Sequence, residues 1–284
     1  MKNILTFDVE EGYHSNLVDS NISEWGGYED RIVEPTLRIL KLLSQTGNTA
    51  TFFILGAVAE KFPELIRRIK SQGHEIASHG YGHKLVYGQN REEFVDDLLR
   101  SKNIVKEIIG ENPIGYRAPS WSFNENTDWI WEALYENGFR YDSSKFPFKT
   151  FLYGSHSNPR FLHGIEIEHG KEIWEIPPST TRIFGKNVPF SGGFYFRSLP
   201  YWFIKYGINR VNKVEHRAAV LYLHPWELDP GQPKLSSGIR HRFIQYYNLG
   251  KTEQKLSRLL HEFRFVSIKH FLITEGLIRG VLVS

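Results

Sequence analysis

Cysteine is absent from this 284-residue sequence, and so is any long apolar run. Without cysteine the chain can form no disulfide framework and perform no thiolate chemistry. No stretch approaches the roughly 20 apolar residues that a membrane-spanning helix requires. Residues 4–8 form a strand-like run directly after the N-terminus, and this run is too short for the hydrophobic region of a secretory signal. We therefore expect a cytoplasmic protein, acting free in the cytoplasm or at the inner face of a membrane.

A strong charge of one sign is missing as well. The net charge is +3, and the basic residues are spread along the chain. This distribution argues against a basic stripe for nucleic acid and against a polybasic membrane anchor. Aromatic residues make up 14% of the sequence, which gives mild support to a carbohydrate partner, although core packing is the commoner reason for such a content. The twelve histidines, mostly neutral at pH 7, suit metal binding and proton transfer.

Short apolar runs alternate with amphipathic helical patterns along most of the chain, which predicts a parallel sheet covered by helices. The expected strands cover residues 4–9, 49–55, 74–77, 114–117, 139–141, 172–176 and 218–223. The expected helices cover residues 35–44, 62–71, 91–109, 127–136, 199–211 and 252–262. A final strand and helix are expected between residue 262 and the end of the sequence. Residues 147–193, rich in Gly, Pro, His and Ser, are expected to form a long irregular excursion. One barrel-like α/β domain over residues 1–284 is the simplest account.

Residues with chemical potential follow the expected strands, where active sites of such folds lie. His79 and His83 come first in importance, because residues four apart share one face of a helical turn and can reach one ion. A pair at this spacing also occurs by chance, so it is weak on its own. Other residues are therefore needed to support a metal site.

Three carboxylates end the first expected strand. On an extended chain Asp8 and Glu10 point the same way, so that one can bind a metal while the other handles a proton. The alternative is a solvated acidic turn, and we assign Glu11 to that alternative.

Three further residues end expected strands. Arg117 can pair with a buried carboxylate, although it can also be a surface residue before a turn. His224 ends a hydrophobic strand and suits a general acid, with a structural histidine as the alternative. Asp142 can hydrogen-bond a histidine and raise its pKa, or it can cap a turn.

Together and in this order, these segments resemble the motifs of the polysaccharide deacetylase family, also known as carbohydrate esterase family four or the NodB homology domain. The matching segments are residues 6–10, 78–83, 117–119, 142–143 and 223–225. The resemblance covers about residues 1–230. Residues 8–10, 192–197, 224–230 and 247–249 are further similar to deacetylases of exopolysaccharide loci that accompany exosortase genes. The extra C-terminal segment of that branch corresponds to about residues 231–284.

The resemblance implies a distorted (β/α) barrel of about seven parallel strands, with an irregular insertion and a C-terminal extension. It implies a divalent metal, Zn²⁺ or else Co²⁺, Ni²⁺ or Mn²⁺, on His79 and His83. The family commonly has a second aspartate next to the first, where this sequence has Val9, which cannot bind a metal. Glu10 is the candidate substitute, and Asp8 and Glu10 can also trade roles.

The resemblance also implies the catalytic roles. Asp8 matches the general base, and Arg117 matches the residue that pairs with this base. His224 matches the general acid, and Asp142 matches the carboxylate that tunes it. Ser120 stands where the family uses a backbone N–H to stabilise the oxyanion.

The implied substrate is an N-acetylated polysaccharide or oligosaccharide, which loses its acetyl groups as acetate. Trp121, Tyr195 and Trp226 are candidates for lining its groove, and Arg197 is a candidate for meeting an anionic sugar. Each of these four can equally be a packing residue. The rival interpretations are a metal amidohydrolase for a formamide or cyclic imide, an inactive carbohydrate-binding homologue, and a structural metal protein.

Overall fold

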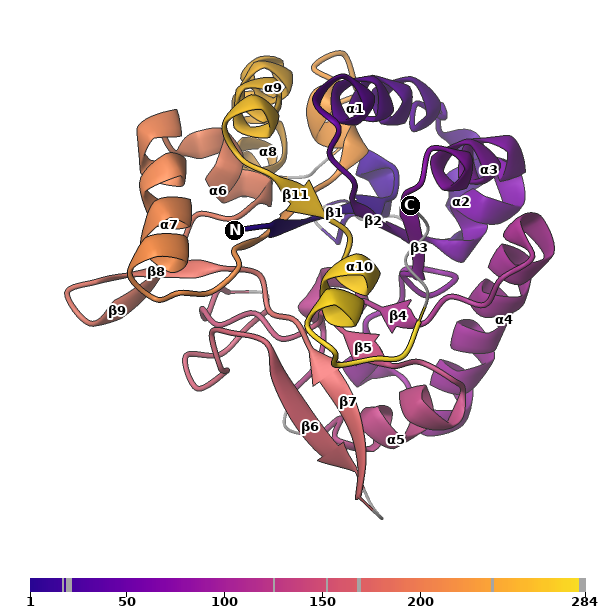
Figure 1. The fold of residues 1–284 in the computed structure, drawn as a ribbon. Helices are drawn as coiled ribbons and strands as arrows, with labels where there is room; N and C mark the ends of the chain where they lie inside the picture. Colours follow the sequence, from indigo (N-terminus) through magenta and orange to yellow (C-terminus); the bar gives the residue numbers. More distant parts are fainter. Residues whose placement is uncertain are drawn as a thin grey trace.

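The computed structural model describes residues 1–16, 18, 22–124, 126–151, 153–167, 170–235 and 238–280. Its centre is a nine-stranded sheet, in which the strand order is β10-β1-β2-β3-β4-β5-β7-β6 and β11 also pairs with β1 (Figure 1). The strands are β1 (Asn3–Val9), β2 (Thr51–Ile54), β3 (Glu75–Ser78), β4 (Gly115–Tyr116), β5 (Tyr141–Asp142), β6 (His163–Ile167), β7 (Lys171–Glu175), β10 (Val220–Leu223) and β11 (Phe265–Val266). Seven parallel strands run from β10 to β7, and only β6 is antiparallel to its neighbour. The sheet curls into a half-barrel, which confirms the expected fold class.

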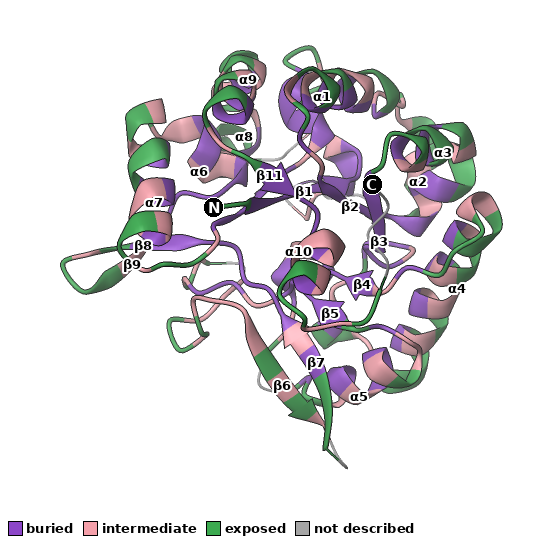
Figure 2. Cartoon of the chain, in the orientation of Figure 1, coloured by how far each residue is buried: buried purple, intermediate pink, exposed green. Residues whose placement is uncertain are grey.

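The helices cover the outer face of the sheet, and one helix lies inside the curl (Figure 1). They are α1 (Val33–Thr46), α2 (Gly56–Lys61), α3 (Pro63–Ser71), α4 (Arg91–Ile109), α5 (Trp129–Glu136), α6 (Gly193–Ser198), α7 (Tyr201–Lys213), α8 (Ile239–Tyr246), α9 (Thr252–Glu262) and α10 (Ile268–Thr274). Helix α10 is the inner one. Figure 2 shows buried residues on the strands and exposed residues on the outward sides of the helices, which is the pattern of amphipathic elements around one core.

The alternation of side chains along β1 explains why polar residues collect inside the curl. Leu5, Phe7 and Val9 belong to the large cluster between the sheet and the outer helices. Ile4 belongs instead to the inner cluster, together with Ile268 of α10. Because alternate residues of a strand face the same side, Thr6 and Asp8 follow Ile4 to the inside. Each fully buried large apolar side chain contributes about 1.5–3 kcal/mol, so this alternation is strongly fixed.

Helix α4 shows how local signals place an element. The side chain of Asn90 accepts the backbone N–H of Glu93 at 3.0 Å, and the side chain of Glu93 accepts the backbone N–H of Asn90 at 3.0 Å. This reciprocal capping satisfies two backbone groups that the first turn leaves free. The helix ends at Gly110, whose φ of 75° suits glycine.

The excursion at residues 147–193 is more ordered than expected. It contains a hairpin of β6 and β7 and a second hairpin of β8 (Thr180–Ile183) and β9 (Lys186–Pro189).

Helices α2, α6 and α8 were not expected, because elements of six to eight residues show too little periodicity in a sequence. Of the expected C-terminal segment 231–284, residues 236, 237 and 281–284 lie outside the described residues.

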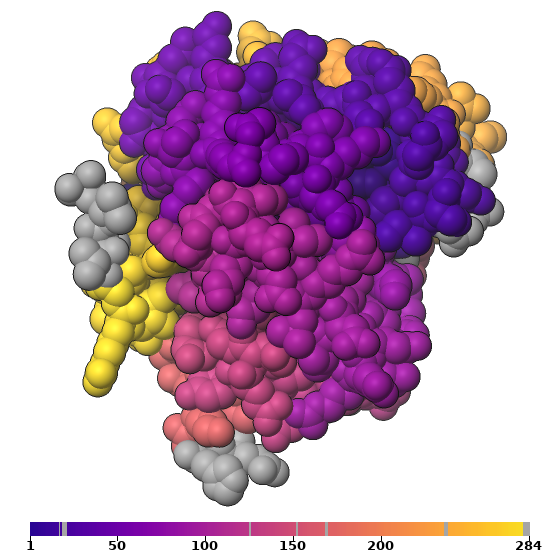
Figure 3. Space-filling view, turned by 90° about the vertical axis from the view of Figure 1, so that its right-hand side faces the viewer, coloured from indigo at the N-terminus to yellow at the C-terminus, as the bar shows by residue number. Residues whose placement is uncertain are grey.

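The two halves of the chain occupy different flanks of the molecule. The side shown in Figure 3 is formed mainly by the N-terminal half, coloured indigo to magenta, with yellow and orange C-terminal residues at the edges. Figure 1 places the orange helices α6 to α8 on the other flank. Both halves contribute strands to the one sheet, so that any site at its edge draws on both.

Candidate active site

A cavity of about 340 Å³ opens at the carboxyl ends of the parallel strands. Its wall includes most residues that the sequence marked as candidates, namely Asp8, Glu10, His79, His83, Ser120, Trp121, Tyr195, Arg197, His224 and Trp226. Two further candidates, Arg117 and Asp142, are fully buried and do not line the cavity. Residues distant in the sequence therefore meet at one edge of the sheet.

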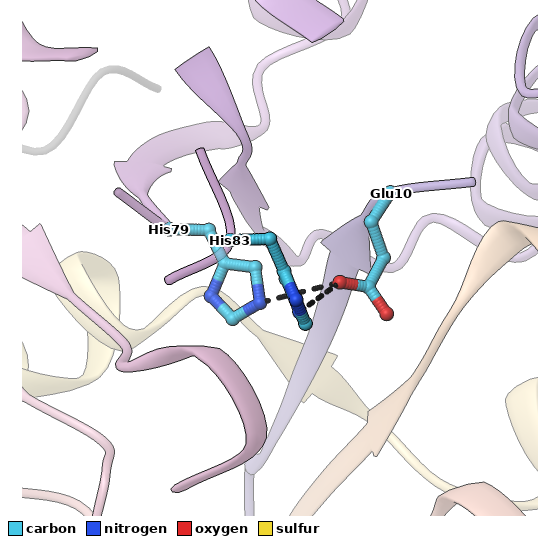
Figure 4. A group of neighbouring side chains, drawn as sticks. All are labelled: Glu10, His79 and His83. Carbon is cyan, nitrogen blue, oxygen red and sulfur yellow. Dashed lines mark ion pairs between the residues drawn. The ribbon is translucent and has the colours of Figure 1, made fainter. Parts of the chain in front are cut away.

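Glu10, His79 and His83 point toward one another (Figure 4). The Oε2 atom of Glu10 lies 2.7 Å from Nε2 of His83 and 3.6 Å from Nε2 of His79. One possible ligand atom of each residue lies within 4.8 Å of the other two, and all three residues are buried. Two imidazole nitrogens and one carboxylate oxygen are a donor set that catalytic zinc sites use.

The surroundings of this cluster fit a divalent cation. Nδ1 of His79 lies 2.8 Å from the carbonyl oxygen of Arg117, which assigns the proton to Nδ1 and leaves Nε2 free as a ligand. The buried Oε2 of Glu10 faces Nε2 of both histidines and makes no hydrogen bond to any other described residue. Burial raises the pKa of Glu10, but the charge of His83 and the hydrogen bonds of both histidines together hold this pKa well below its usual value. An ionised carboxylate is thus available to a cation.

The segment that carries the two histidines is a loop, so the expected helical turn is wrong. Gly80 and His83 have φ angles of 72° and 51°, in the left-handed region. Asp97 of α4 accepts the backbone N–H groups of Tyr81 at 2.6 Å and Gly82 at 3.1 Å. This irregular turn, held by Asp97, brings the two imidazole centroids to 5.5 Å from each other.

Asp8 is paired with Arg117 beside the cluster. Nη1 of Arg117 donates to Oδ1 of Asp8 at 2.6 Å and to Oγ1 of Thr6 at 2.9 Å. Nε and Nη2 donate to the carbonyl and the hydroxyl oxygen of Ser143 at 3.1 and 2.8 Å. The guanidinium carbon lies 4.2 Å from the centre of the Phe53 ring. The expected pairing is present, and the guanidinium is held from several sides in one orientation.

His224 faces both carboxylates of β1. Its Nε2 lies 3.8 Å from Oδ2 of Asp8 and 3.8 Å from Oε1 of Glu10. Its Nδ1 lies 3.2 Å from Oε2 of Glu227, and Oε1 of Glu227 accepts Nε–H of Arg197 at 2.7 Å. Burial lowers the pKa of His224, but Glu227 above all, followed by Glu10 and Asp8, raises this pKa to about 9. Before a metal binds, His224 therefore carries a proton at neutral pH.

Glu227 is the functional residue that the sequence reasoning missed. It lies three residues after His224 in the short helix Pro225–Leu228, and it is fully buried. Its Oε2 also accepts the backbone N–H of His224 at 3.0 Å, as in a capping box. The available signal was a glutamate three residues after His224, with Pro225 between these two residues.

Asp142 does not contact His224, so its expected tuning role is wrong and the turn-cap alternative is correct. Its two carboxylate oxygens accept the hydroxyl and the backbone N–H of Ser144, each at 2.7 Å. The hydroxyl oxygen of Ser144 in turn accepts the backbone N–H of Ala118 at 2.8 Å. Burial raises the pKa of Asp142 and also that of Glu175, which the charge of Asp142 raises further. Asp142 thus holds the segment that follows Arg117.

Arg197 lines the cavity, but the structure does not support its expected contact with an anionic sugar. Its Nη1 and Nη2 donate to the carbonyl oxygens of Tyr247 at 2.5 Å and Ile244 at 2.7 Å, while Nε binds Glu227. The side chain is 1% exposed, so its donors are already satisfied inside the protein. Burial raises the pKa of Glu227, but the charge of Arg197 helps to hold this pKa below its usual value.

Ser120 and Trp121 lie in a strained turn at the cavity. Their φ angles are 51° and 49°, which non-glycine residues rarely adopt and which costs on the order of 1–3 kcal/mol per residue. The hydroxyl oxygen of Ser120 accepts a hydrogen bond from Nδ2 of Asn16 at 2.7 Å. Strain of this kind persists where the surroundings fix it, and here it accompanies two residues that line the cavity.

Aromatic rings form much of the remaining wall. Trp226 stacks on His224, with ring centroids 5.1 Å apart and planes 24° from parallel. Trp121 packs against Tyr153 at 4.9 Å, and Tyr195 is half-buried nearby in the same wall. The buried indole N–H groups of Trp121 and Trp226 have no hydrogen-bond partner among the described residues. These rings give the cavity a flat, largely apolar wall.

Glu11 is buried, so the expected solvated turn is wrong for this residue. Its Oε1 accepts the backbone N–H groups of Arg31 and Ile32, both at 2.7 Å. Burial raises the pKa of Glu11 to about 7, against the lowering effect of these hydrogen bonds. Glu11 therefore anchors the start of α1 instead of serving the cavity.

The fold is an α/β half-barrel, and the two histidines and one glutamate at the carboxyl edge of its sheet could bind a metal ion. Residues 25–141 match the family model described as polysaccharide deacetylase, and residues 143–273 match a domain of unknown function, DUF3473. Residues 25–141 thus form a polysaccharide deacetylase region, which is followed by the DUF3473 region. The two matches divide the cavity, since His79 and His83 lie in the first region and His224 and Glu227 lie in the second. Asp8 and Glu10 precede both regions.

Among curated proteins, the chain is 37% identical over 107 residues to a peptidoglycan deacetylase of Helicobacter pylori. The aligned residues cover 38% of this chain and 36% of that protein. The chain spans about a third of the length of this relative and of a Bacillus cereus peptidoglycan-N-acetylglucosamine deacetylase.

Among solved structures, a candidate polysaccharide deacetylase of Mycobacterium smegmatis has a TM-score of 0.64 at 23% identity, over 99% of this chain and 93% of that one. A CE4-family pseudoenzyme of Bacillus anthracis has a TM-score of 0.52 at 14% identity, over 95% of this chain and 66% of that one. At these identities the likeness shows the fold, which is shared with an inactive protein. No helix among the described residues is long and apolar enough to cross a membrane.

Proposed function

We propose that this protein is a metal-dependent N-deacetylase, which removes acetyl groups from amino sugars of a polysaccharide or its precursor and releases acetate. The observation that carries the proposal is the meeting of three units at one cavity. These are the Glu10–His79–His83 cluster, the ion pair of Asp8, and the charged His224 with its Nε2 3.8 Å from Asp8 and from Glu10. The polysaccharide deacetylase match of residues 25–141 and the similarity to peptidoglycan deacetylases support the same activity.

The chain supplies a residue for each proton transfer of amide hydrolysis. Asp8, oriented by Arg117, is placed to take a proton from the attacking water. His224, whose Nδ1 faces Glu227, is placed to give a proton from its Nε2 to the departing amine. General acid–base catalysis of this kind contributes about 10²–10⁴-fold.

The developing negative charge also finds partners in the cavity. The backbone N–H of Ser120, at the strained turn, is a candidate oxyanion donor, and such a donor is worth about 3 kcal/mol. When bound at Glu10, His79 and His83, a divalent ion supplies Lewis-acid polarisation of the amide carbonyl. We propose Zn²⁺ for this ion, with Co²⁺, Ni²⁺ or Mn²⁺ as alternatives, because imidazole and carboxylate ligands suit all four.

The finer assignments are proposals of the same kind. Trp121, Tyr195 and Trp226 would stack on sugar rings, since all three line the cavity. The similarity to exosortase-associated deacetylases favours an exopolysaccharide precursor as substrate. The cytoplasmic location and the single-domain organisation expected from the sequence stay predictions.

The test is acetate release from N-acetylglucosamine oligomers by the purified, Zn²⁺-loaded protein. Asp8→Asn and His224→Ala should each lower the rate by about 10²–10⁴-fold while zinc binding, measured by calorimetry, persists. His261→Ala is the matched control, because His261 is exposed on α9 and contacts only the carbonyl of Ser257 in its own helix.

Other outcomes point to the rival functions. Sugar binding without acetate release identifies an inactive carbohydrate-binding homologue. Release of formate, or opening of a cyclic imide, with no acetate identifies a different amidohydrolase. Thermal stabilisation by Zn²⁺ with no turnover, and with no effect of His224→Ala, identifies a structural metal protein.

A further inference from the structure

The outer wall of the cavity is built from segments outside the catalytic motifs. It is formed by the loop around Phe148 and Phe151, by Phe194 and Tyr195 of α6, and by Arg240 and Ile244 of α8. All of them lie within the region matched to the domain of unknown function. This wall is largely aromatic and aliphatic, and Arg240 is its one charged residue apart from the catalytic groups and the Arg197–Glu227 pair.

Arg240 differs from the other charged residues of the cavity in having no charged partner. Asp8 pairs with Arg117 and Arg197 pairs with Glu227, each within 2.7 Å. Glu10 lies with the two histidines of the cluster. Among the described residues, no carboxylate forms an ion pair with Arg240, which is exposed at the cavity.

The guanidinium of Arg240 is nevertheless held in place. Its central carbon lies 4.1 Å from the centre of the Phe151 ring, a cation–π contact. His241, the next residue of α8, stacks on the same ring at 6.2 Å and 13° from parallel. A ring contact occupies the face of a guanidinium and leaves its in-plane N–H groups free, which is the geometry for binding a carboxylate or phosphate through two hydrogen bonds.

We propose that Arg240 binds an oxyanion of the substrate, so that the natural substrate is an acidic N-acetylated glycan. The oxyanion is a carboxylate or a phosphate carried by the sugar that occupies the cavity or by its neighbour. That the ligand is a glycan follows from the proposed deacetylase function, on which this inference rests. Arg240 is a specificity-determining residue, because it adds affinity for the acidic group and takes no part in bond cleavage.

The test compares binding of three probes in the Asp8→Asn background, which slows turnover by about 10²–10⁴-fold. The probes are neutral N-acetylchitotetraose, a hyaluronan tetrasaccharide that carries carboxylates, and N-acetylglucosamine 1-phosphate. Calorimetry should give affinity for at least one acidic probe that is about 10-fold higher than for the neutral one, the expected size for a charge-assisted pair at a partly exposed site. The two acidic probes separate carboxylate from phosphate.

Arg240→Gln should abolish the preference and leave affinity for the neutral probe unchanged. Arg242→Gln is the matched control, since Arg242 is exposed on the same helix and does not line the cavity, and it should keep the preference. The preference should also shrink from about 50 mM to about 500 mM salt, because an exposed ion pair is screened.

The inference is overturned if neutral and acidic probes bind equally, or if Arg240→Gln keeps the preference. Its failure is distinguishable from failure of the proposed function. If neutral and acidic glycans release acetate at equal rates, and Arg240→Gln leaves these rates unchanged, the oxyanion site is refuted. The proposed deacetylase function is then still supported. A preference that depends on Arg240, without acetate release from any probe, supports the oxyanion site and refutes the deacetylase.

Discussion

Replacing Glu227 by Gln should convert His224 from a charged to a neutral residue at pH 7. In the metal-free protein the pKa of His224 is raised from 6.5 to about 9, although burial lowers it. A rise of this size corresponds to about 3 kcal/mol in favour of the protonated imidazole. The hydrogen bond and the charge of Glu227 are the largest contributions in the raising direction. Their removal leaves burial opposed mainly by Glu10 and Asp8, so we expect the pKa of His224 to fall back toward its ordinary value of 6.5.

The same change should alter the dependence of stability on pH. A histidine whose pKa is higher in the folded than in the unfolded state stabilises the fold fully below its unfolded pKa, and this stabilisation is lost as the pH rises through the folded pKa. For the metal-free wild type the loss therefore falls between pH 6.5 and about 9 and amounts to about 3 kcal/mol. In Glu227→Gln this contribution should nearly vanish.

Two assays measure these effects. Proton NMR of the imidazole C–H groups gives the pKa of His224 directly, after assignment with His224→Ala, and urea unfolding at several pH values gives the stability. The control is Glu215→Gln, which breaks the Arg160–Glu215 ion pair away from the cavity and should leave the pKa of His224 unchanged. A pKa near 9 that persists in Glu227→Gln would refute the assignment of Glu227 as the partner of His224.

Three further predictions follow from the same contacts. Arg117→Met leaves the buried Asp8 unpaired and should lower the free energy of unfolding by about 3–5 kcal/mol in urea denaturation; a loss under about 1 kcal/mol would contradict this. His83→Ala removes a ligand and should weaken zinc binding at least about 100-fold by calorimetry, whereas unchanged affinity would show that the ion binds elsewhere. Gly80→Ala places a methyl group 2.8 Å from Oδ2 of Asp97 at a φ of 72°. It should lower the free energy of unfolding by about 1–3 kcal/mol, measured by thermal denaturation, and weaken zinc binding. Unchanged stability and zinc affinity would contradict the role of this turn.

The strand pattern made much of the fold and half of the site predictable. Parallel strands bring their carboxyl ends to one edge, so residues that follow strands, such as Asp8, His79 and His224, meet regardless of their distance in sequence. Alternation along β1 further predicted that Asp8 and Glu10 share a side. These regularities belong to backbone geometry, and therefore they can be recognised in a single sequence.

Contacts that depend on loop conformation were not predictable in this way. Asp142 ends a strand next to the site, yet its carboxylate turns back to Ser144 because an aspartate readily bonds the backbone two residues on. Arg197 has the charge expected of an anion-binding residue, but its donors face Glu227 and two backbone carbonyls of a later segment. In both cases the outcome is set by partners whose positions only the folded chain defines.

The short helices α2, α6 and α8 escaped prediction for a related reason. Helix α8 carries Arg240 to the cavity, but only one of its eight residues, Gln245, is buried. A helix this short depends on tertiary packing for its stability and leaves little periodic pattern in the sequence.

The most direct test of the account is the metal dependence of acetate release. The protein is treated with a chelator, dialysed, and assayed on N-acetylglucosamine oligomers before and after addition of one equivalent of Zn²⁺. The account predicts no release from the stripped wild type, recovery with Zn²⁺, and no recovery in His83→Ala. Equal acetate release with and without metal, or recovery in His83→Ala, would contradict the assignment of Glu10, His79 and His83 as the catalytic metal site.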